Sequence, residues 1–350
     1  MVKKLSFFNK ILFIINTIFA IALIFAILLP RLSPNKFGVF SLFSIVVPAV
    51  IIINILFVVY WILVGFKKQL LQSFIVLIIS YFFIPQLYKF NDNINQEDSN
   101  TISVMSFNVR KFNMYKWIKV DDIESKIKDF VENEDPDILA LQEYRIPKNF
   151  KLKYPYFSNP TLENYSDSIQ NSKHRIALGI YSKYPIVKQG IIKYARTSAA
   201  AMFVDVVKRI DTIRIYTFHM ASLGIVPNQH YFGHDDSEKL VKKVRQSFKV
   251  QQQQIDSLNK HINTCKYKVI VTGDLNNTAY SWAYNNVKNN FKDTYLEAGE
   301  GFGTTYKFNK FPLRIDYIFV DKHFKVKSHK NYGIQLSDHY PIMATLELIK

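Results

Sequence analysis

Cysteine is almost absent from this sequence of 350 residues, in which Cys265 is the only example. A single cysteine excludes a framework of intramolecular disulfides, so the chain is either intracellular or exported as a domain large enough to fold without them. Cys265 lies in a polar connection without the surroundings of a nucleophile, and we interpret it as a structural residue. Internal repeats and low-complexity segments are also missing, which argues against a repeat architecture.

Acidic residues are missing from one part of the chain. Residues 1–90 contain no Asp and no Glu but eight Lys and Arg, whereas residues 91–350 hold all 28 acidic residues and the other 37 basic ones. The formal net charge of +17 therefore divides into +8 and +9. This division predicts two parts that face different solvents, a membrane domain at residues 1–90 and a water-soluble domain after it.

Three long uncharged runs fill the acid-free part, at residues 11–30, 37–66 and 69–88. A helix needs about 20 apolar residues to cross a bilayer, so these runs predict three transmembrane helices and a lipid bilayer as the partner of residues 1–90. A cleaved signal peptide is the alternative for the first run. Its apolar core is longer than the roughly 7–15 residues of a signal peptide, and two further runs follow it, so we favour an uncleaved helix.

The basic residues between these runs indicate an orientation. If the N-terminus is inside, five of the eight lie on the inner side and three on the outer side, a small excess in the direction of the positive-inside rule. Three crossings then place the rest of the chain outside. We therefore predict a multi-pass protein of the inner or plasma membrane with an extracytoplasmic soluble domain.

Residues 91–100 are polar and acidic, which indicates a linker, and one α/β domain follows at residues 101–350. In it, short apolar runs that favour strands alternate with amphipathic segments that favour helices. Several strands follow one another closely, which predicts antiparallel pairs in two packed sheets with helices outside. The predicted strands are 101–109, 137–141, 175–181, 199–207, 212–219, 268–272, 313–320, 324–328 and 342–348, and the predicted helices are 121–133 and 237–258.

Polar residues follow many of these apolar runs directly. The clearest case is the run 268–272, which ends in Gly273, Asp274, Leu275 and Asn276 and so predicts a strand that presents a carboxylate and an amide at its carboxyl end. Ligands bind at the carboxyl ends of strands in α/β folds, and buried carboxylates are unfavourable unless they are paired or bind a metal. We therefore predict one common site. Its members are Asn108, Glu143, His219, Asp274, Asn276, Asp316, Asp338 and His339.

The residue types in this set indicate its chemistry. Carboxylates and amides without a cysteine cluster favour a hard cation that prefers oxygen ligands, Mg²⁺ or Mn²⁺. The two histidines can transfer protons or stabilise an oxyanion, and Asp316 can fix the tautomer of His339. We interpret the combination as a site that hydrolyses a phosphate ester.

Six blocks carry these residues: Ser106–Arg110, Leu141–Glu143, Thr217–His219, Gly273–Asn276, Arg314–Phe319 and Ser337–Pro341. Together and in this order they resemble the endonuclease/exonuclease/phosphatase superfamily of DNase I-like, Mg²⁺-dependent enzymes, and the chain would be a membrane-anchored, bacterial-type member. The resemblance covers residues 101–350. It implies a four-layer α/β sandwich, in which two mixed sheets are flanked by helices and the site lies at one edge of both.

The resemblance also implies which residues contact the metal and the substrate. Glu143 would be the principal metal ligand, with Asn108 beside it and Asp338 close to the metal. Arg110 is a further candidate for contact with the substrate phosphate.

The remaining residues would carry out catalysis. Asp274 would orient or deprotonate the attacking water, and Asn276 would contact the phosphate. His339, paired with Asp316, would stabilise or protonate the phosphoryl oxygens. His219 resembles the second histidine of the DNase and sphingomyelinase branches, which argues against an abasic-site endonuclease.

Two substrate classes stay open at this point. The charge of +9 on the soluble domain suits nucleic acid, whereas a membrane tether suits a phospholipid headgroup. A non-catalytic binding module that retains the fold is the alternative from a different class, and the complete set of polar residues argues against it. No obligate protein partner is evident from the sequence. The Lys and Arg residues along 237–258 are interpreted as a solvated helix face.

Overall fold

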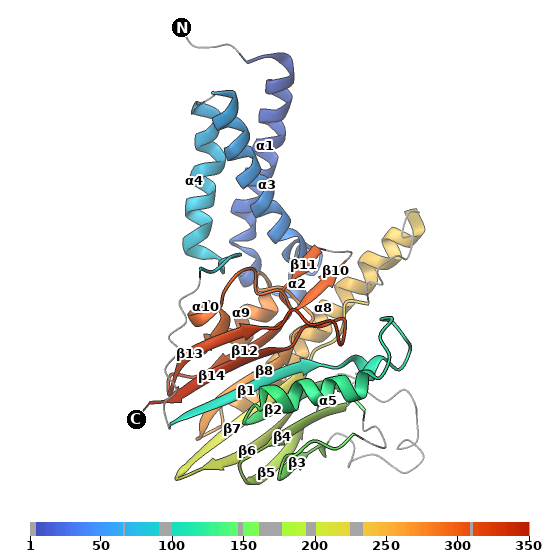
Figure 1. The fold of residues 1–350 in the computed structure, drawn as a ribbon. Coiled ribbons are helices and arrows are strands. Elements are labelled where there is room, and N and C mark those ends of the chain that lie inside the picture. Colours follow the sequence, from blue (N-terminus) through green and yellow to red (C-terminus); the bar gives the residue numbers. More distant parts are fainter. Residues whose placement is uncertain are drawn as a thin grey trace. The chain divides into compact units, whose positions relative to one another are not determined.

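The computed structural model describes residues 5–65, 67–90, 100–145, 150–160, 177–193, 201–224, 234–308 and 311–349. All of the predicted linker except its last residue lies outside these ranges. The chain divides into two compact units, which Figure 1 shows coloured by sequence. The first unit comprises Met1–Leu87 and Asn277–Asn286, and the second comprises Tyr88–Asn276 and Val287–Lys350.

The first unit consists mainly of three apolar helices, α1 (Phe7–Ala26), α3 (Phe43–Val64) and α4 (Lys67–Phe83). Gly65, with a φ of 78°, ends α3 in the left-handed conformation that glycine adopts without strain. Because α4 begins two residues later, the two helices form a hairpin. Short turns of helix connect α1 to α3: η1 (Leu29–Arg31), α2 (Pro34–Phe37) and η2 (Phe40–Leu42).

A buried polar network joins these three helices. Asn16 of α1 donates to Ser73 of α4 (2.5 Å), and Ser73 donates to Asn54 of α3 (2.8 Å). The indole of Trp61 donates to the side-chain oxygen of Asn16 (2.9 Å). Buried polar groups need such partners, so the network specifies one arrangement of the helices.

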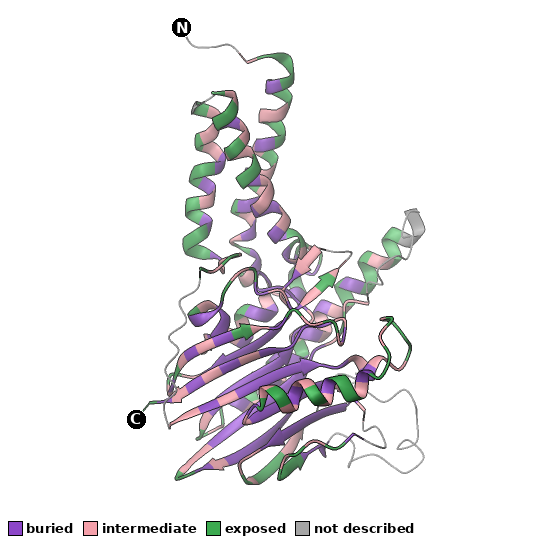
Figure 2. Ribbon diagram, viewed as in Figure 1, coloured by how far each residue is buried: buried purple, intermediate pink, exposed green. Residues whose placement is uncertain are grey.

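Two helical segments among the described residues, not the three predicted, are long and apolar enough to cross a membrane. They are Phe7–Arg31 and Phe40–Val64, each of 25 residues with a mean hydropathy of 2.9. The third predicted run, 69–88, contributes only the 17-residue α4, because its helix ends at Phe83 ahead of Pro85. Large apolar side chains are exposed on all three helices, and Figure 2 colours the exposed positions of the ribbon green.

Residues 277–286 belong to the first unit although they are far from α3 in sequence. The hydroxyl of Thr278 donates to the carbonyl oxygen of Ser44 (2.6 Å), and the hydroxyl of Ser44 donates to Oδ1 of Asn277 (3.3 Å). Tyr280 packs in the same apolar cluster as Leu23 of α1. This short segment is therefore part of the helical unit.

The second unit contains two six-stranded mixed sheets within the described ranges. In each, one pair of strands is parallel, β1 with β2 and β7 with β8, and the other pairs are antiparallel. The first sheet has the order β13 (Phe324–Asn331), β14 (Ile342–Leu348), β1 (Thr101–Asn108), β2 (Ile138–Tyr144), β4 (Ala177–Ser182) and β3 (Tyr156–Ser158). The second has the order β5 (Ile186–Ile192), β6 (Ala201–Lys208), β7 (Asp211–His219), β8 (Lys268–Asp274), β12 (Asp316–Val320) and β9 (Lys292–Asp293).

Alternating side chains divide this unit into layers. Ile102 and Val104 of β1 point inward and pack with Ile213 and Ile270 of the second sheet. Residues of the opposite parity, such as Met105, pack outward against α5 (Ile123–Glu134). Successive side chains of a strand point to opposite faces of the sheet, and here both faces are buried, as Figure 2 shows.

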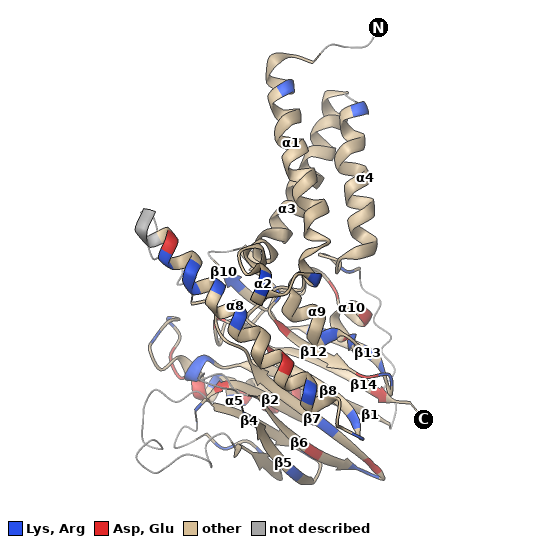
Figure 3. Ribbon diagram, turned by 180° about the vertical axis from the view of Figure 1, so that it is seen from behind, with Lys and Arg blue, Asp and Glu red and all other residues tan. Residues whose placement is uncertain are grey.

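The long helix α8 (His234–Ile262) covers the outer face of the second sheet, as Figure 3 shows. Its residues Val244, Phe248, Ile255 and Leu258 are buried, as the predicted apolar stripe requires. Lys and Arg line its outer side. The helix extends beyond both ends of the predicted range, 237–258. Two mixed sheets flanked by helices are thus confirmed.

The predicted strand 313–320 is confirmed only over 316–320, and its predicted start is wrong. The structure has a short hairpin, β10 (Tyr306–Phe308) with β11 (Phe311–Leu313), and then the separate strand β12. The break has a physical cause, because the backbone N–H groups of Ile315 and Asp316 both donate to the hydroxyl of Thr305 (2.9 and 3.1 Å). The remaining short helices are η3 (Arg110–Asn113), α9 (Trp282–Lys288) and α10 (Thr294–Ala298).

Candidate active site

Asp274, the last residue of β8, lies at the centre of the candidate site. The strand register places His219 of β7 opposite it on one side and Asp316 of β12 opposite it on the other. Gly273 precedes it with a φ of 141°, and a Cβ there would lie 2.1 Å from the carbonyl oxygen of Phe218. Only glycine therefore allows β7 and β8 to approach as closely as the site requires.

Residues from the first sheet complete the site. Nδ2 of Asn108, the last residue of β1, donates to Oδ2 of Asp274 (3.0 Å) and lies 3.5 Å from Oε1 of Glu143 in β2. Nε2 of His219 lies 3.5 Å from Oδ2 of Asp274 and 3.7 Å from Oε1 of Glu143. The carboxyl ends of two strands from each sheet therefore meet at one point.

His339 and Asp316 form the predicted pair. Nδ1 of His339 lies 2.9 Å from Oδ2 of Asp316, and its Nε2 lies 3.8 Å from Oδ2 of Asp274. The ring of Tyr306 packs against the imidazole with 5.0 Å between the centroids. The Asp316 carboxylate thus orients the ring so that its second nitrogen faces Asp274.

Asn276 and Asp338 make contacts that the sequence did not predict. Nδ2 of Asn276 donates to Oδ2 of Asp274 (3.1 Å) and to the carbonyl oxygen of Met220 (3.0 Å), and its backbone N–H donates to Oδ1 of Asp274 (2.7 Å). Asn276 therefore orients the Asp274 carboxylate in this structure. Asp338 forms an ion pair with Arg110, the predicted phosphate contact. Contact of Asn276 with phosphate and of Asp338 with metal both stay predictions.

The backbone is strained where it presents Glu143. This residue has a φ of 46°, and the pairing of β2 with β4 shifts register between Leu141 and Tyr144. A bulge of this kind redirects a side chain out of the regular alternation. Strain in a non-glycine residue persists only where the surrounding structure enforces it, and such residues cluster at functional sites.

The charges of the site perturb one another. Burial alone would raise the pKa of Glu143, but His219, His339 and Arg110 hold it below its ordinary value. Burial raises the pKa of Asp274 to about 6, against the opposing effect of His339. For His339 burial acts to lower the pKa, yet the carboxylates of Asp316 and Asp274 raise it to about 9. Perturbed pKa values of both signs in one cluster are typical of catalytic sites.

The donor set fits a divalent cation. Within the described ranges, Asp274, Asp316 and His339 place possible ligand atoms within 4.8 Å of one another, and all three residues are buried. Oδ1 of Asp316 is buried without a hydrogen-bond partner. The side chain of Asn108 connects Asp274 to the carboxylate of Glu143. Oxygen ligands of this kind suit Mg²⁺ or Mn²⁺.

Thr305 is a residue of the site that the sequence did not reveal. It is fully buried and accepts the two backbone hydrogen bonds at the start of β12, and its carbonyl oxygen accepts from the N–H of Tyr340 (2.7 Å). It thus connects the segments that carry Asp316 and His339. In the sequence it only follows a glycine-rich turn, and no pattern distinguishes it from other turn threonines.

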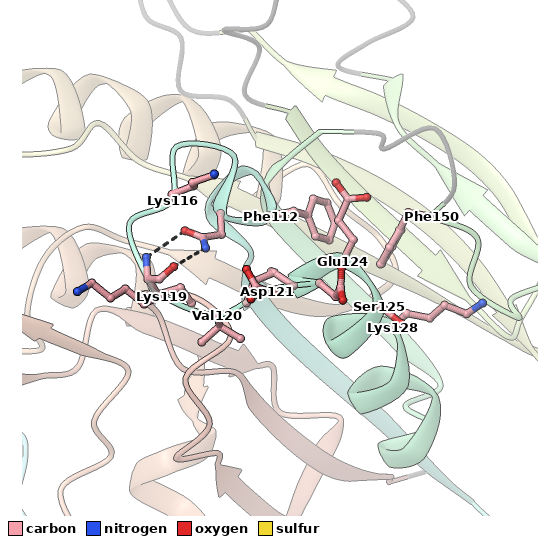
Figure 4. Close-up of a pocket in the computed structure, with 13 residues that line it drawn as sticks. Phe112, Lys116, Lys119, Val120, Asp121, Glu124, Ser125, Lys128 and Phe150 are labelled. Carbon is pink, nitrogen blue, oxygen red and sulfur yellow. Dashed lines mark hydrogen bonds between the residues drawn. The ribbon is translucent and has the colours of Figure 1, made fainter.

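A pocket of about 820 Å³ lies beside the site rather than at it. Figure 4 shows it between η3, the loop that follows and the first turn of α5, with Phe112 and Phe150 on one wall and Lys116 and Lys119 on the loop. None of the predicted site residues lines this pocket. Its volume suits a small ligand, but the titratable groups that suit catalysis gather around Asp274.

The sequence matches a model described as the Endonuclease/Exonuclease/phosphatase family over residues 105–339. The chain belongs to this family. A second model, described as a domain of unknown function (DUF8431), matches residues 9–87. No curated protein matches the sequence.

Solved structures of endonuclease/exonuclease/phosphatase proteins share the fold of the second unit. The human nocturnin catalytic domain with bound sulfate is 16% identical, with a TM-score of 0.52 over 74% of this chain and 97% of the chain of that domain. D. rerio TDP2 complexed with a single-strand DNA product is 18% identical, with a TM-score of 0.51 over 71% of this chain and all of that one. A family member from Bacteroides thetaiotaomicron is 18% identical, with a TM-score of 0.52 over 73% of this chain and 100% of its own. At such low identity these similarities show the fold alone.

Proposed function

We propose that the chain is a membrane-anchored, divalent-metal-dependent phosphoesterase that hydrolyses a phosphodiester or phosphomonoester. The observation that carries the proposal is the surroundings of Asp274 Oδ2. Asn108, His219, Asn276 and His339 all direct a nitrogen toward this one oxygen, at 3.0 to 3.8 Å. A buried carboxylate with several donors and two histidines provides both a proton acceptor and cationic groups, which a binding module does not need.

Glu143 and Asn108 are the residues that would hold the metal. Glu143 keeps a lowered pKa and is therefore ionised, and its side chain is about a fifth exposed. The carboxylates of Asp316 and Asp274 raise the pKa of His339 to about 9, and we assign this residue to the phosphoryl oxygens rather than to the metal. When bound, the metal would offset the negative charge that develops on the phosphoryl oxygens.

The protein's own groups account for the proton transfers. Water attacks phosphorus in line with the leaving oxygen, so that one P–O bond forms as the other breaks. Asp274 orients this water and accepts its proton, for which a pKa near 6 is well suited, and the leaving oxygen takes up a proton from solvent as its bond to phosphorus breaks. Protonated His339 donates from Nε2 to the phosphoryl oxygens, and Asp316 keeps its ring in place. His219 lies on the side of Asp274 opposite His339, and its Nε2 can donate a hydrogen bond to the phosphoryl oxygens as well.

We also propose that α1, α3 and α4 all cross the bilayer, so that the catalytic domain is extracytoplasmic. At 1.5 Å per residue, α4 is about 26 Å long, near the lower limit for a crossing. The tight turn at Gly65 returns α4 along α3, and the Asn16, Ser73 and Asn54 network holds it there. Phe74, Ile75 and Phe82 of α4 are exposed to an extent that suits lipid contact.

The test uses the full chain in neutral detergent, assayed with Mg²⁺ against DNA, RNA, sphingomyelin and phosphoinositides in parallel. We expect EDTA to abolish hydrolysis and Mg²⁺ to restore it. Glu143→Ala and His339→Ala should each lower kcat by about 10²- to 10⁴-fold while circular dichroism shows that the fold is retained at the assay temperature. Glu297→Ala at an exposed position and His323→Ala at a half-buried one, both in the same unit, are the matched controls. Full activity in Glu143→Ala would refute the assignment.

A further inference from the structure

The loop that follows β1 carries two exposed aromatic rings beside the phosphoester site. Tyr115 and Trp117 are 45% and 43% exposed, and their ring centroids lie 4.9 Å apart at 67°. The other fully exposed side chains between positions 110 and 120 are Lys116 and Lys119, whereas Met114, Ile118 and Val120 are half-buried. Exposed large rings are unfavourable in water, and their grouping indicates a ligand surface.

Cations connect the rings to the site. The guanidinium of Arg110 lies 4.3 Å from the ring centroid of Trp117 and also pairs with Asp338. The ammonium of Lys111 lies 5.2 Å from the centroid of Tyr115. The backbone N–H of Arg110 donates to Oδ1 of Asn108 (3.0 Å), so the loop begins at the site itself.

The loop is held rigidly rather than left free. Asn113 bridges it, since Nδ2 donates to the carbonyl oxygen of Ile118 (2.8 Å) and Oδ1 accepts from the N–H of the same residue (3.1 Å). Phe112 is buried against Phe150, with 4.7 Å between centroids. Arg110, Lys111, Phe112, Asn113 and Lys116 all have positive φ. A surface fixed in advance loses little conformational entropy on binding.

We propose that residues 110–119 form a subsite that binds single-stranded nucleic acid, with the bases stacked on Trp117 and Tyr115. The proposal rests on the phosphoesterase function above and names the substrate class of that site. Aromatic rings with interleaved cations bind single strands in this way, because each base offers a ring face and each linkage a negative charge. Two carboxylates, Asp121 and Asp122, follow the loop, whereas the loop itself carries four cations. The segment therefore keeps a net positive charge that suits a polyanion.

A lipid surface is the competing occupant. A loop that enters a bilayer exposes aliphatic side chains together with Trp, Tyr and Lys, whereas here the exposed apolar groups are both aromatic. The aromatic faces also carry cations, which would have to lose their hydration in an apolar layer. The observations therefore favour nucleic acid.

The experiment measures binding in EDTA, so that its outcome is independent of hydrolysis. Anisotropy of a short labelled oligothymidylate is recorded with the full chain in neutral detergent, and inorganic polyphosphate and short-chain phosphatidylglycerol serve as competitors. We expect Trp117→Ala to weaken oligonucleotide binding by about tenfold, and Trp117→Phe, which keeps a ring, by less than about threefold. Tyr115→Ala should act in the same direction. Tyr156→Ala, an exposed ring of β3, is the matched control.

Polyphosphate should bind with the same affinity to the wild type and to Trp117→Ala, because it has charge but no bases. Wild-type affinity in Trp117→Ala, or an equal loss in Tyr156→Ala, would overturn the proposal. An equal loss of polyphosphate binding would also overturn it, since Trp117 would then act only by placing Arg110. Ring-dependent competition by phosphatidylglycerol would assign the loop to lipid. If the subsite is correct and the phosphoesterase function is not, binding is retained and Mg²⁺ produces no cleavage.

Discussion

His329 is expected to destabilise the second unit when the pH falls. It lies in β13, is almost fully buried, and its Nδ1 is 2.8 Å from the hydroxyl of Thr294. That hydroxyl donates to the carbonyl oxygen of Ile318 (3.0 Å), so Nδ1 must carry the proton of the neutral ring. Nε2 is buried without a hydrogen-bond partner in this structure, so a second proton there would be poorly solvated, and the side chain of Asn331 offsets only part of this cost.

The size of this loss of stability follows from the lowered pKa of His329. Burial lowers the pKa of His329 from 6.5 to about 4, and Arg314 adds to this effect while Asp293 opposes it. As the pH falls, the unfolded chain therefore binds the proton first. The free energy of unfolding is unaffected well above pH 6.5 and decreases between pH 6.5 and 4, by about 3 kcal/mol in total at 1.36 kcal/mol per pKa unit. Typical stabilities are about 5–15 kcal/mol, so this decrease is large.

Asp274 acts in the opposite direction in the same range. Its pKa is raised to about 6, so its folded form takes up a proton before the unfolded chain does, and stability rises as the pH falls below 6. The contribution of His329 must therefore be isolated by substitution. His329→Gln keeps a donor for Thr294 but does not titrate.

The assay is urea denaturation of the full chain in neutral detergent at pH 7 and pH 4.5. We expect the wild type to lose about 2–3 kcal/mol more than His329→Gln between the two pH values. If the wild type and the variant lose the same stability, the buried neutral state of His329 is not the cause of the acid sensitivity and the reasoning is refuted.

Three further predictions concern other parts of the chain. Asp205→Ala should destabilise the second unit by about 3–5 kcal/mol, because it removes the bidentate partner (2.6 and 2.7 Å) of the buried Arg214; in urea denaturation the double variant Asp205→Ala with Arg214→Met should recover most of the loss. A reporter enzyme that folds only outside the cytoplasm should be active when it is fused to the C-terminus. Activity of a reporter that folds only in the cytoplasm would instead show that α4 does not cross the membrane. Thr278→Val should lower the thermal stability of the first unit by about 1 kcal/mol through loss of its hydrogen bond to Ser44, whereas Thr278→Ser should retain it; equal melting temperatures for both would exclude a role for the hydroxyl.

Local patterns predicted much of the fold and of the candidate site. Alternation of apolar residues located β1, β6 and β7, because a strand buried on one or both faces must place every second side chain in the core. Polar residues directly after such runs located Asn108, His219 and Asp274, since the carboxyl ends of neighbouring strands meet at one sheet edge. The pairing of His339 with Asp316 was also predicted, and the structure places them 2.9 Å apart.

Contacts between distant segments could not be predicted in this way. The strained bulge at Glu143 depends on the pairing of β2 with β4. Asn276 has the sequence context of a ligand contact, but its amide is held by Asp274 and by the carbonyl oxygen of Met220. Thr305 interrupts the predicted strand 313–320 because its hydroxyl takes two backbone hydrogen bonds.

The sequence alone determined that this protein has an acid-free apolar part, a following α/β part and the ordered blocks of the endonuclease/exonuclease/phosphatase family, because composition, periodicity and motif order are properties of neighbouring residues. Only the tertiary structure decided that residues 277–286 pack with the helical unit, that α4 is a short helix, and that the rings of Trp117 and Tyr115 stand beside cations at the site. These features depend on which distant side chains complete each hydrogen bond and exclude water from each ring, and a linear pattern does not encode those partners.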